Sequence, residues 1–119
     1  MVRNRNQRRG GTEMSTRARI GVLKEDGTVD SIVLFQDGYP DYAGGMLARY
    51  YTDEKKIAEL LALGNLFFLA SSPQKCRAEQ NSTFQTFSSV ASYINKSQGD
   101  FLDYLYIYID GEWKYMEMN

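Results

Sequence analysis

Two Asp-Gly dipeptides, Asp26-Gly27 and Asp110-Gly111, each stand between two apolar runs of strand length. This arrangement is the strongest short-range signal for a β-hairpin, because the favoured two-residue turns need positive φ at their central positions. A first hairpin is predicted over residues 17–35. A second is predicted over residues 104–117, where tyrosines alternate with aliphatic residues at a period of two. A hairpin near each end constrains how the middle of the chain can fold.

Between the hairpins the apolar residues recur at helical spacing, and Gly and Pro mark the turns. The run from Asp37 to Gly45 holds three glycines, a proline, two aspartates and two tyrosines, which predicts a tight strand-to-helix corner. The further predicted elements are helices over 42–51 and 52–64, a buried strand over 66–70, a loop over 71–82, a short strand over 83–87 and a helix over 88–95.

This order of elements predicts an α+β fold. We expect an antiparallel sheet built from the N- and C-terminal hairpins, with two to three helices on one face. A chain of 119 residues has room for one domain, which we place at residues 14–119.

Residues 1–13 are predicted to be a disordered basic arm, because they contain almost nothing to bury. A second interpretation is that they are a mis-annotated leader and that Met14 is the natural start. The residues just before Met14, Arg-Arg-Gly-Gly-Thr-Glu, are what a purine-rich ribosome-binding site encodes when it is translated in frame.

Charge is distributed unevenly along the chain. Residues 1–19 carry six arginines against Glu13, a net +5, whereas the remainder carries eight basic and fourteen acidic residues, a net −6. An acidic domain repels phosphate backbones, so nucleic acid is not expected as the main partner. No apolar run reaches the roughly 18 residues of a membrane span, and we expect a cytoplasmic protein with no membrane partner.

The sequence lacks the residue sets of common enzymes. It has no histidine, and the single Cys76 cannot form an internal disulfide or a zinc site. No phosphate-binding or nucleophile motif is present. Asp37 and Asp41 are four residues apart and could hold a cation or share a proton, but capping of the turn and the following helix is the favoured interpretation. We therefore expect that the protein is not an enzyme and that it binds no metal and no cofactor.

Binding of a small nucleotide is the function that the residue types favour. Tyrosines at every second position of a strand offer a surface on which flat rings can stack. Arginines on the first strand could hold phosphate oxygens, and a glycine-rich helix start offers backbone N–H groups. The predicted ligand-binding residues are Arg17, Arg19, Tyr39, Tyr42, Tyr106 and Trp113.

A structural role for the tyrosines is the alternative. Tyrosines on antiparallel strands often pair across strands or close a subunit interface. The aromatic side of the C-terminal hairpin needs a cover, and in a chain this short we expect a second copy, hence a homo-oligomer. An acidic, tyrosine-rich surface would also suit an inhibitor that binds a basic protein surface.

The chain resembles small phage and prophage proteins. The residues that carry the resemblance are Ser15-Thr16-Arg17, Ile20-Gly21, the corner Asp37-Gly38-Tyr39-Pro40, the helix from Lys56 to Gly64, and the terminal Asp-Gly-Glu-Trp. The likeness is weak between Ser71 and Gln98. Members of that group have a His and a Trp or Ser just before the Asp-Gly-Tyr-Pro element, where this chain has Leu34, Phe35 and Gln36.

Within these phage proteins the chain is similar to the Thoeris anti-defence type 1 sponges, which bind cyclic ADP-ribose isomers. The resemblance implies a non-enzymatic oligomer with ligand sites between subunits, which sequesters a cyclic nucleotide immune signal in the bacterial host cytoplasm. Immune evasion by sequestration of a cyclic ADP-ribose isomer or a cyclic oligonucleotide is thus the expected function. The alternative is a protein-binding inhibitor of a host defence complex.

Overall fold

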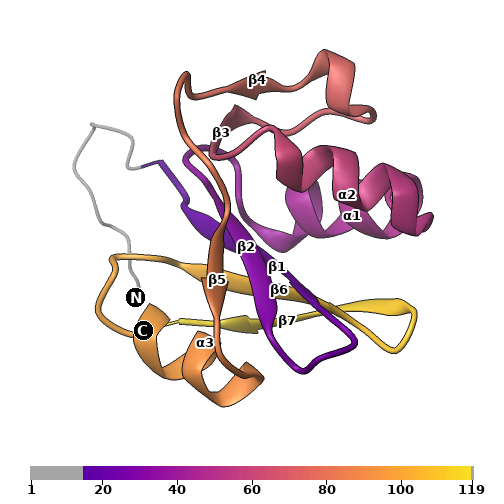
Figure 1. Ribbon diagram of the computed structural model, residues 1–119. Helices are drawn as coiled ribbons and strands as arrows, with labels where there is room; N and C mark the ends of the chain where they lie inside the picture. Colours follow the sequence, from indigo (N-terminus) through magenta and orange to yellow (C-terminus); the bar gives the residue numbers. More distant parts are fainter. Residues whose placement is uncertain (1–14, 119) are drawn as a thin grey trace.

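The computed structural model describes residues 15–118, which form a seven-stranded mixed sheet with helices on both faces (Figure 1). Both predictions about residues 1–13, a disordered arm or a leader before Met14, concern a part of the chain outside the described residues. Within residues 15–118, no helix has the length and apolar character that a membrane crossing requires.

The elements follow one another in this order: β1 (Ala18–Leu23), β2 (Val29–Leu34), the π-helical turn η1 (Pro40–Gly44), α1 (Gly45–Tyr50), α2 (Glu54–Ala62), β3 (Leu66–Phe68), the 3-10 turn η2 (Pro73–Lys75), β4 (Arg77–Ala78), β5 (Gln85–Phe87), α3 (Val90–Ser97), β6 (Tyr104–Ile109) and β7 (Glu112–Glu117). Both predicted hairpins are present, as β1–β2 and β6–β7. The segment predicted as a loop over 71–82 contains η2 and the short β4.

The prediction of an antiparallel sheet is wrong. The strand order is β4-β3-β2-β1-β6-β7, and β5 also pairs with β2. The two hairpins meet through β1 and β6, which run parallel with Ala18 beside Tyr104 and Val22 beside Tyr108. A second parallel contact joins β2 to β3. Alternating side chains reveal that a segment is a strand, but they carry no information on the direction of its neighbour.

The prediction that the helices share one face is also wrong. Figure 1 shows α1 and α2 on one side of the sheet and α3 on the other. Residues of α1 and α2 pack with Ile20 and Tyr106 in one core, whereas Tyr93 of α3 packs with Leu105 in a second core. Both faces of β1 and β6 are therefore buried, which is how a strand with parallel neighbours in a mixed sheet is usually found.

Gly21 makes room for the helix on the second face. A Cβ at Gly21 would lie 2.6 Å from Cζ and 2.7 Å from the hydroxyl oxygen of Tyr93. Tyr93 is 1% exposed, and its hydroxyl donates to the backbone oxygen of Tyr106 at 2.7 Å. The Tyr93 side chain thus lies over β1 at Gly21, the position of β1 that has no side chain, and reaches the backbone of β6.

We expect Gly21→Ala to lower the free energy of unfolding by about 1–3 kcal/mol, because the methyl group overpacks the Tyr93 contact. Gly45→Ala is the matched control. A Cβ at Gly45 meets nothing within 4 Å, and its backbone is helical, so alanine should stabilise the chain by about 0.5–1 kcal/mol. Urea unfolding of both variants measures the difference. Equal effects would show that the Tyr93 contact does not constrain β1.

Candidate functional site

The six residues predicted to bind a ligand do not form one site. Arg19 projects toward the α3 side of the sheet and is 5% exposed. Its guanidinium pairs with Asp100 at 2.6 Å, donates to Gln85 at 3.1 Å and lies 5.2 Å from the ring centroid of Phe87. Arg17 is exposed, outside β1, and its guanidinium lies 5.8 Å from the Phe35 ring centroid. The guanidinium groups of both arginines thus contact other side chains of this chain. Arg19 also lies on the opposite face of the sheet from Tyr106.

Three of the four aromatic residues predicted to bind a ligand instead donate hydrogen bonds to backbone carbonyl groups. The Tyr106 hydroxyl donates to the oxygen of Gly38 at 2.8 Å, and its ring is 1% exposed. Tyr42 donates to Leu69 at 2.6 Å, and the indole N–H of Trp113 donates to Tyr51 at 2.8 Å. The fourth, Tyr39, is 38% exposed at the start of η1.

The tyrosine stripe of β6 therefore holds the fold together. Tyr106 and Tyr108 belong to the core beneath α1 and α2, and they pair across strands with Tyr115 and Trp113 respectively. The ring centroids of Tyr108 and Trp113 lie 5.1 Å apart. This arrangement is the structural role that the sequence left open as the alternative to ligand stacking.

The corner from Asp37 to Gly45 joins β2 to α1 through the turn η1. The helical turn η1 has no side-chain cap, so the favoured interpretation of Asp37 and Asp41 as caps is wrong for this turn. Asp37 has φ 57, a left-handed conformation that aspartate tolerates. Among the residues that the structure describes, no group of three or more His, Cys, Asp or Glu side chains could hold a metal ion.

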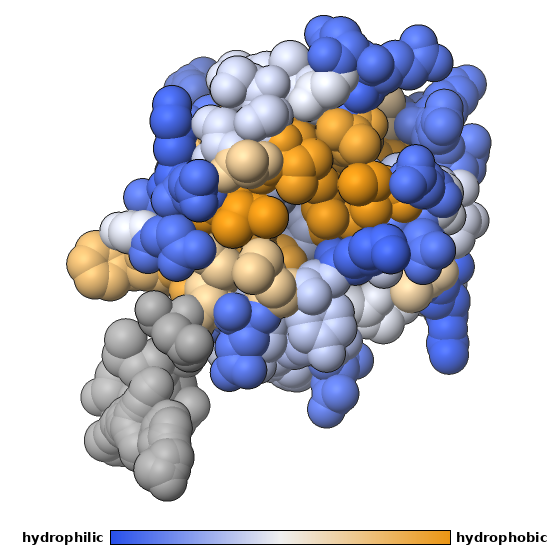
Figure 2. Space-filling view, turned by 90° about the horizontal axis from the view of Figure 1, so that it is seen from below, coloured by the Kyte–Doolittle hydropathy of each residue, from blue (hydrophilic) through white to orange (hydrophobic). Residues whose placement is uncertain are grey.

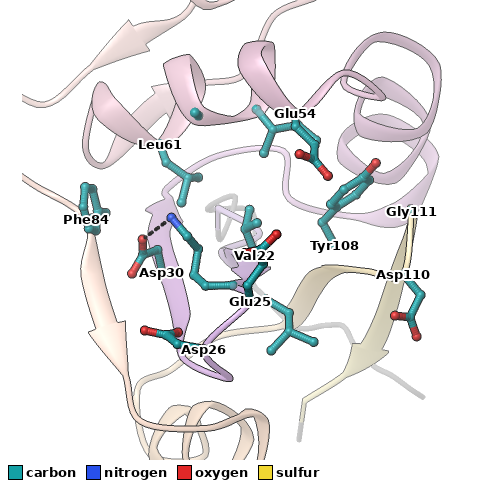
Figure 3. A pocket seen from close by; sticks show the side chains of 14 residues that line it. Val22, Glu25, Asp26, Asp30, Glu54, Leu61, Phe84, Tyr108, Asp110 and Gly111 are labelled. Atoms are coloured by element: carbon teal, nitrogen blue, oxygen red, sulfur yellow. Dashed lines mark hydrogen bonds and ion pairs between the residues drawn. The ribbon is translucent and has the colours of Figure 1, made fainter.

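A hollow of the described surface lies elsewhere, at one end of the sheet. It is a cleft of about 710 Å³, within the range of ligand-binding cavities. In Figure 3, α2 runs along one side and the β1–β2 turn along the other, with Phe84 near one end and Asp110 and Gly111 near the other. The parallel pairing of β1 with β6 brings both Asp-Gly turns to this same end of the sheet.

The lining combines an apolar wall with an acidic rim. Most of its apolar and aromatic members are buried or half-buried, whereas its charged members, five carboxylates against one ammonium group, are mostly exposed. The apolar and aromatic members are Val22, Leu23, Ile57, Ala58, Leu61, Phe84 and Tyr108, and the charged members are Lys24, Glu25, Asp26, Asp30, Glu54 and Asp110.

Two of the five carboxylates have partners of their own. Asp30 pairs with Lys24 at 3.4 Å, marked by the dashed line in Figure 3, and accepts from the Thr86 hydroxyl at 2.7 Å. Hydrogen bonds from the side chain and the backbone of Thr28 lower the pKa of Asp26. For Glu25, Glu54 and Asp110, the described residues supply no hydrogen bond or ion pair to the side chain. Three carboxylates therefore remain free to meet a cation.

Sequence reasoning missed this site because it assigned both Asp-Gly dipeptides to turns and nothing more. The assignment was correct locally, since the turns do close the two hairpins. The signal available in the sequence was the acidic excess after residue 19. That excess predicts a negative surface, but only the strand directions decide that the carboxylates meet around one cleft.

Comparison with known protein families, with curated proteins and with solved structures finds no match for this chain.

The buried tyrosines predict a loss of stability at alkaline pH. Burial raises the pKa of both Tyr93 and Tyr106 above the ordinary tyrosine value of about 10. The stabilisation from their neutral hydroxyls is fully present below the pKa that tyrosine has in the unfolded chain. It is lost as the pH rises above about 10, because the tyrosines of the unfolded chain then release their protons before those of the folded chain.

We expect the free energy of unfolding in urea to fall between about pH 9.5 and 11. Tyr106→Phe should flatten this dependence. It should also lower stability at neutral pH by about 1–3 kcal/mol, because the buried Gly38 carbonyl loses its donor. An unchanged alkaline slope in Tyr106→Phe would contradict the assignment of a buried, neutral hydroxyl.

Proposed function

We propose that this chain is a non-enzymatic binding protein whose acidic cleft receives a basic segment of a protein partner. The observation that carries the proposal is the combination of a cleft of about 710 Å³, an apolar wall and five carboxylates against one lysine. An arginine or lysine side chain matches this combination, because its aliphatic stem packs on apolar surface and its charged head can meet the carboxylates.

The positions of the aromatic residues support the same ligand chemistry. Phe84 is 43% exposed and lines the cleft near one end, and Tyr108 lines the wall. A cation above the face of an aromatic ring is attracted by about 0.5–2 kcal/mol, more when it is desolvated. Glu25, Glu54 and Asp110 can then hold the guanidinium or ammonium group by charge-assisted hydrogen bonds.

The proposal selects between the two functions that the sequence suggests. A cyclic nucleotide carries negative phosphates, which the acidic rim repels, and the arginines expected to hold those phosphates lie on other parts of the molecule. A protein-binding inhibitor of a host defence complex fits the cleft. In the phage setting that the resemblance implies, we propose that the partner is a basic protein of such a complex in the host cytoplasm.

The first test is calorimetric titration of the full chain with an arginine- and lysine-rich peptide that also carries apolar residues. We expect saturable binding that weakens with salt. The triple variant Glu25→Gln, Glu54→Gln, Asp110→Asn should bind about tenfold more weakly, because three exposed charge contacts of about 0.5 kcal/mol each are lost.

A second triple variant separates the cleft from the general charge of the protein. Asp37→Asn, Asp41→Asn and Glu117→Gln remove the same number of exposed carboxylates outside the cleft, from the opposite end of the sheet. We expect this control to bind within about twofold of the unaltered chain, since solvent-exposed charges beyond a Debye length of about 8–10 Å are screened. Equal weakening in both triple variants, or a melting-temperature increase with a cyclic ADP-ribose isomer and none with the peptide, would contradict the proposal.

A further inference from the structure

Phe101 is the most anomalous side chain on the described surface. It lies between α3 and β6 and is 89% exposed, far more than any other large apolar side chain of residues 15–118. Its φ is 57, in the left-handed region. The other non-glycine residues with positive φ in that range are Asp37, Asn81 and Asp110, residue types that tolerate this conformation, whereas a bulky aromatic does not. The backbone is thus held in an unfavourable conformation that presents the ring to solvent.

The next residue shows that the exposure is not a consequence of a loose segment. Leu102 is 8% exposed and belongs to the core between α3 and the sheet. Asp100, on the other side, holds the buried guanidinium of Arg19. Phe101 is therefore fixed between two anchored residues and points outward as a knob.

The elements on either side of the knob line an apolar groove. The groove lies between α3 and the β6–β7 hairpin and has a volume of about 150 Å³. Figure 2 shows apolar side chains gathered around a hollow on the face seen from below, the side on which α3 lies in Figure 1. The groove residues are Val90, Tyr93, Ile94, Leu105, Ile107, Lys114, Tyr115 and Met116.

The size and the charge of the groove match the knob. A cavity of about 150 Å³ with mainly apolar walls is large enough to hold a benzene ring. The one charged residue that lines the groove is Lys114, whereas the knob is flanked by the exposed carboxylate of Asp103 and by Asp100, which pairs with Arg19. A knob inserted into the groove of another copy would bring opposite charges together.

We propose that a second copy of this chain covers the face that carries α3, with Phe101 of each copy inserted into the groove of the other. The interface uses the same surface patch on both copies, as a two-fold dimer requires. Such a dimer is independent of the acidic cleft and does not use the tyrosines of β6, which point to the opposite face. It removes from water the exposed ring of Phe101 and the exposed side chain of Met116 together.

The test is the dimer dissociation constant of the full chain, measured by analytical ultracentrifugation over a range of concentrations. We expect a concentration-dependent dimer. Phe101→Asn removes the ring and suits the left-handed backbone, so it should keep the fold while raising the dissociation constant by at least about 30-fold, the loss typical of a binding hot spot. Phe84→Asn, which changes an exposed phenylalanine of the cleft, should leave the dimer unchanged.

A complementation experiment tests the knob-and-groove geometry itself. Met116→Glu places a carboxylate in the groove and should also abolish the homodimer. A mixture of Phe101→Asn and Met116→Glu chains should form a heterodimer, because the intact knob of the second fits the intact groove of the first. Native mass spectrometry distinguishes the species. An unaltered chain that stays monomeric at every concentration, an unchanged dissociation constant in Phe101→Asn, or no heterodimer in the mixture would overturn the proposal.

Discussion

The parallel pairing of β1 with β6 is the constraint on which the rest of the structure depends. It places Ala18 beside Tyr104 and joins the two hairpins into one sheet. Parallel neighbours need a long crossover connection, and here the connection carries all three helices and covers both faces. It also brings Lys24 and Asp110, which follow directly after β1 and β6, to the same end of the sheet. The acidic cleft exists because of that direction; antiparallel strands would have put the two turns at opposite ends.

The local elements were predictable from the sequence, whereas their arrangement was not. Both Asp-Gly turns, the apolar stripe of α2 and the alternation in β6 are short-range signals, and each appears in the structure. The direction of β1 against β6 depends on contacts between residues more than eighty positions apart, which no local pattern encodes. The same holds for Gly21, whose role is visible only once Tyr93 lies above it.

The predicted site residues illustrate a second limit. Tyr42, Tyr106 and Trp113 were chosen because they combine a flat ring with a polar group, but that combination serves equally well to tie a buried ring to a backbone carbonyl. Arg19 was chosen for its charge, and the fold uses that charge in a nearly buried ion pair with Asp100. Residue type alone could not distinguish these roles. The acidic excess was readable from the sequence, and its concentration around a cleft required the tertiary structure.

The most direct test of the central claim is a map of where a basic peptide binds, obtained from amide chemical-shift changes as the peptide is added to the isotope-labelled full chain. We predict that the changes cluster at the cleft, in the turn of Lys24 to Asp26, along the first half of α2 and at Asp110 and Gly111. Changes centred on Arg17 and Tyr39, changes spread evenly over all acidic surface residues, or no saturable change at all would contradict the account.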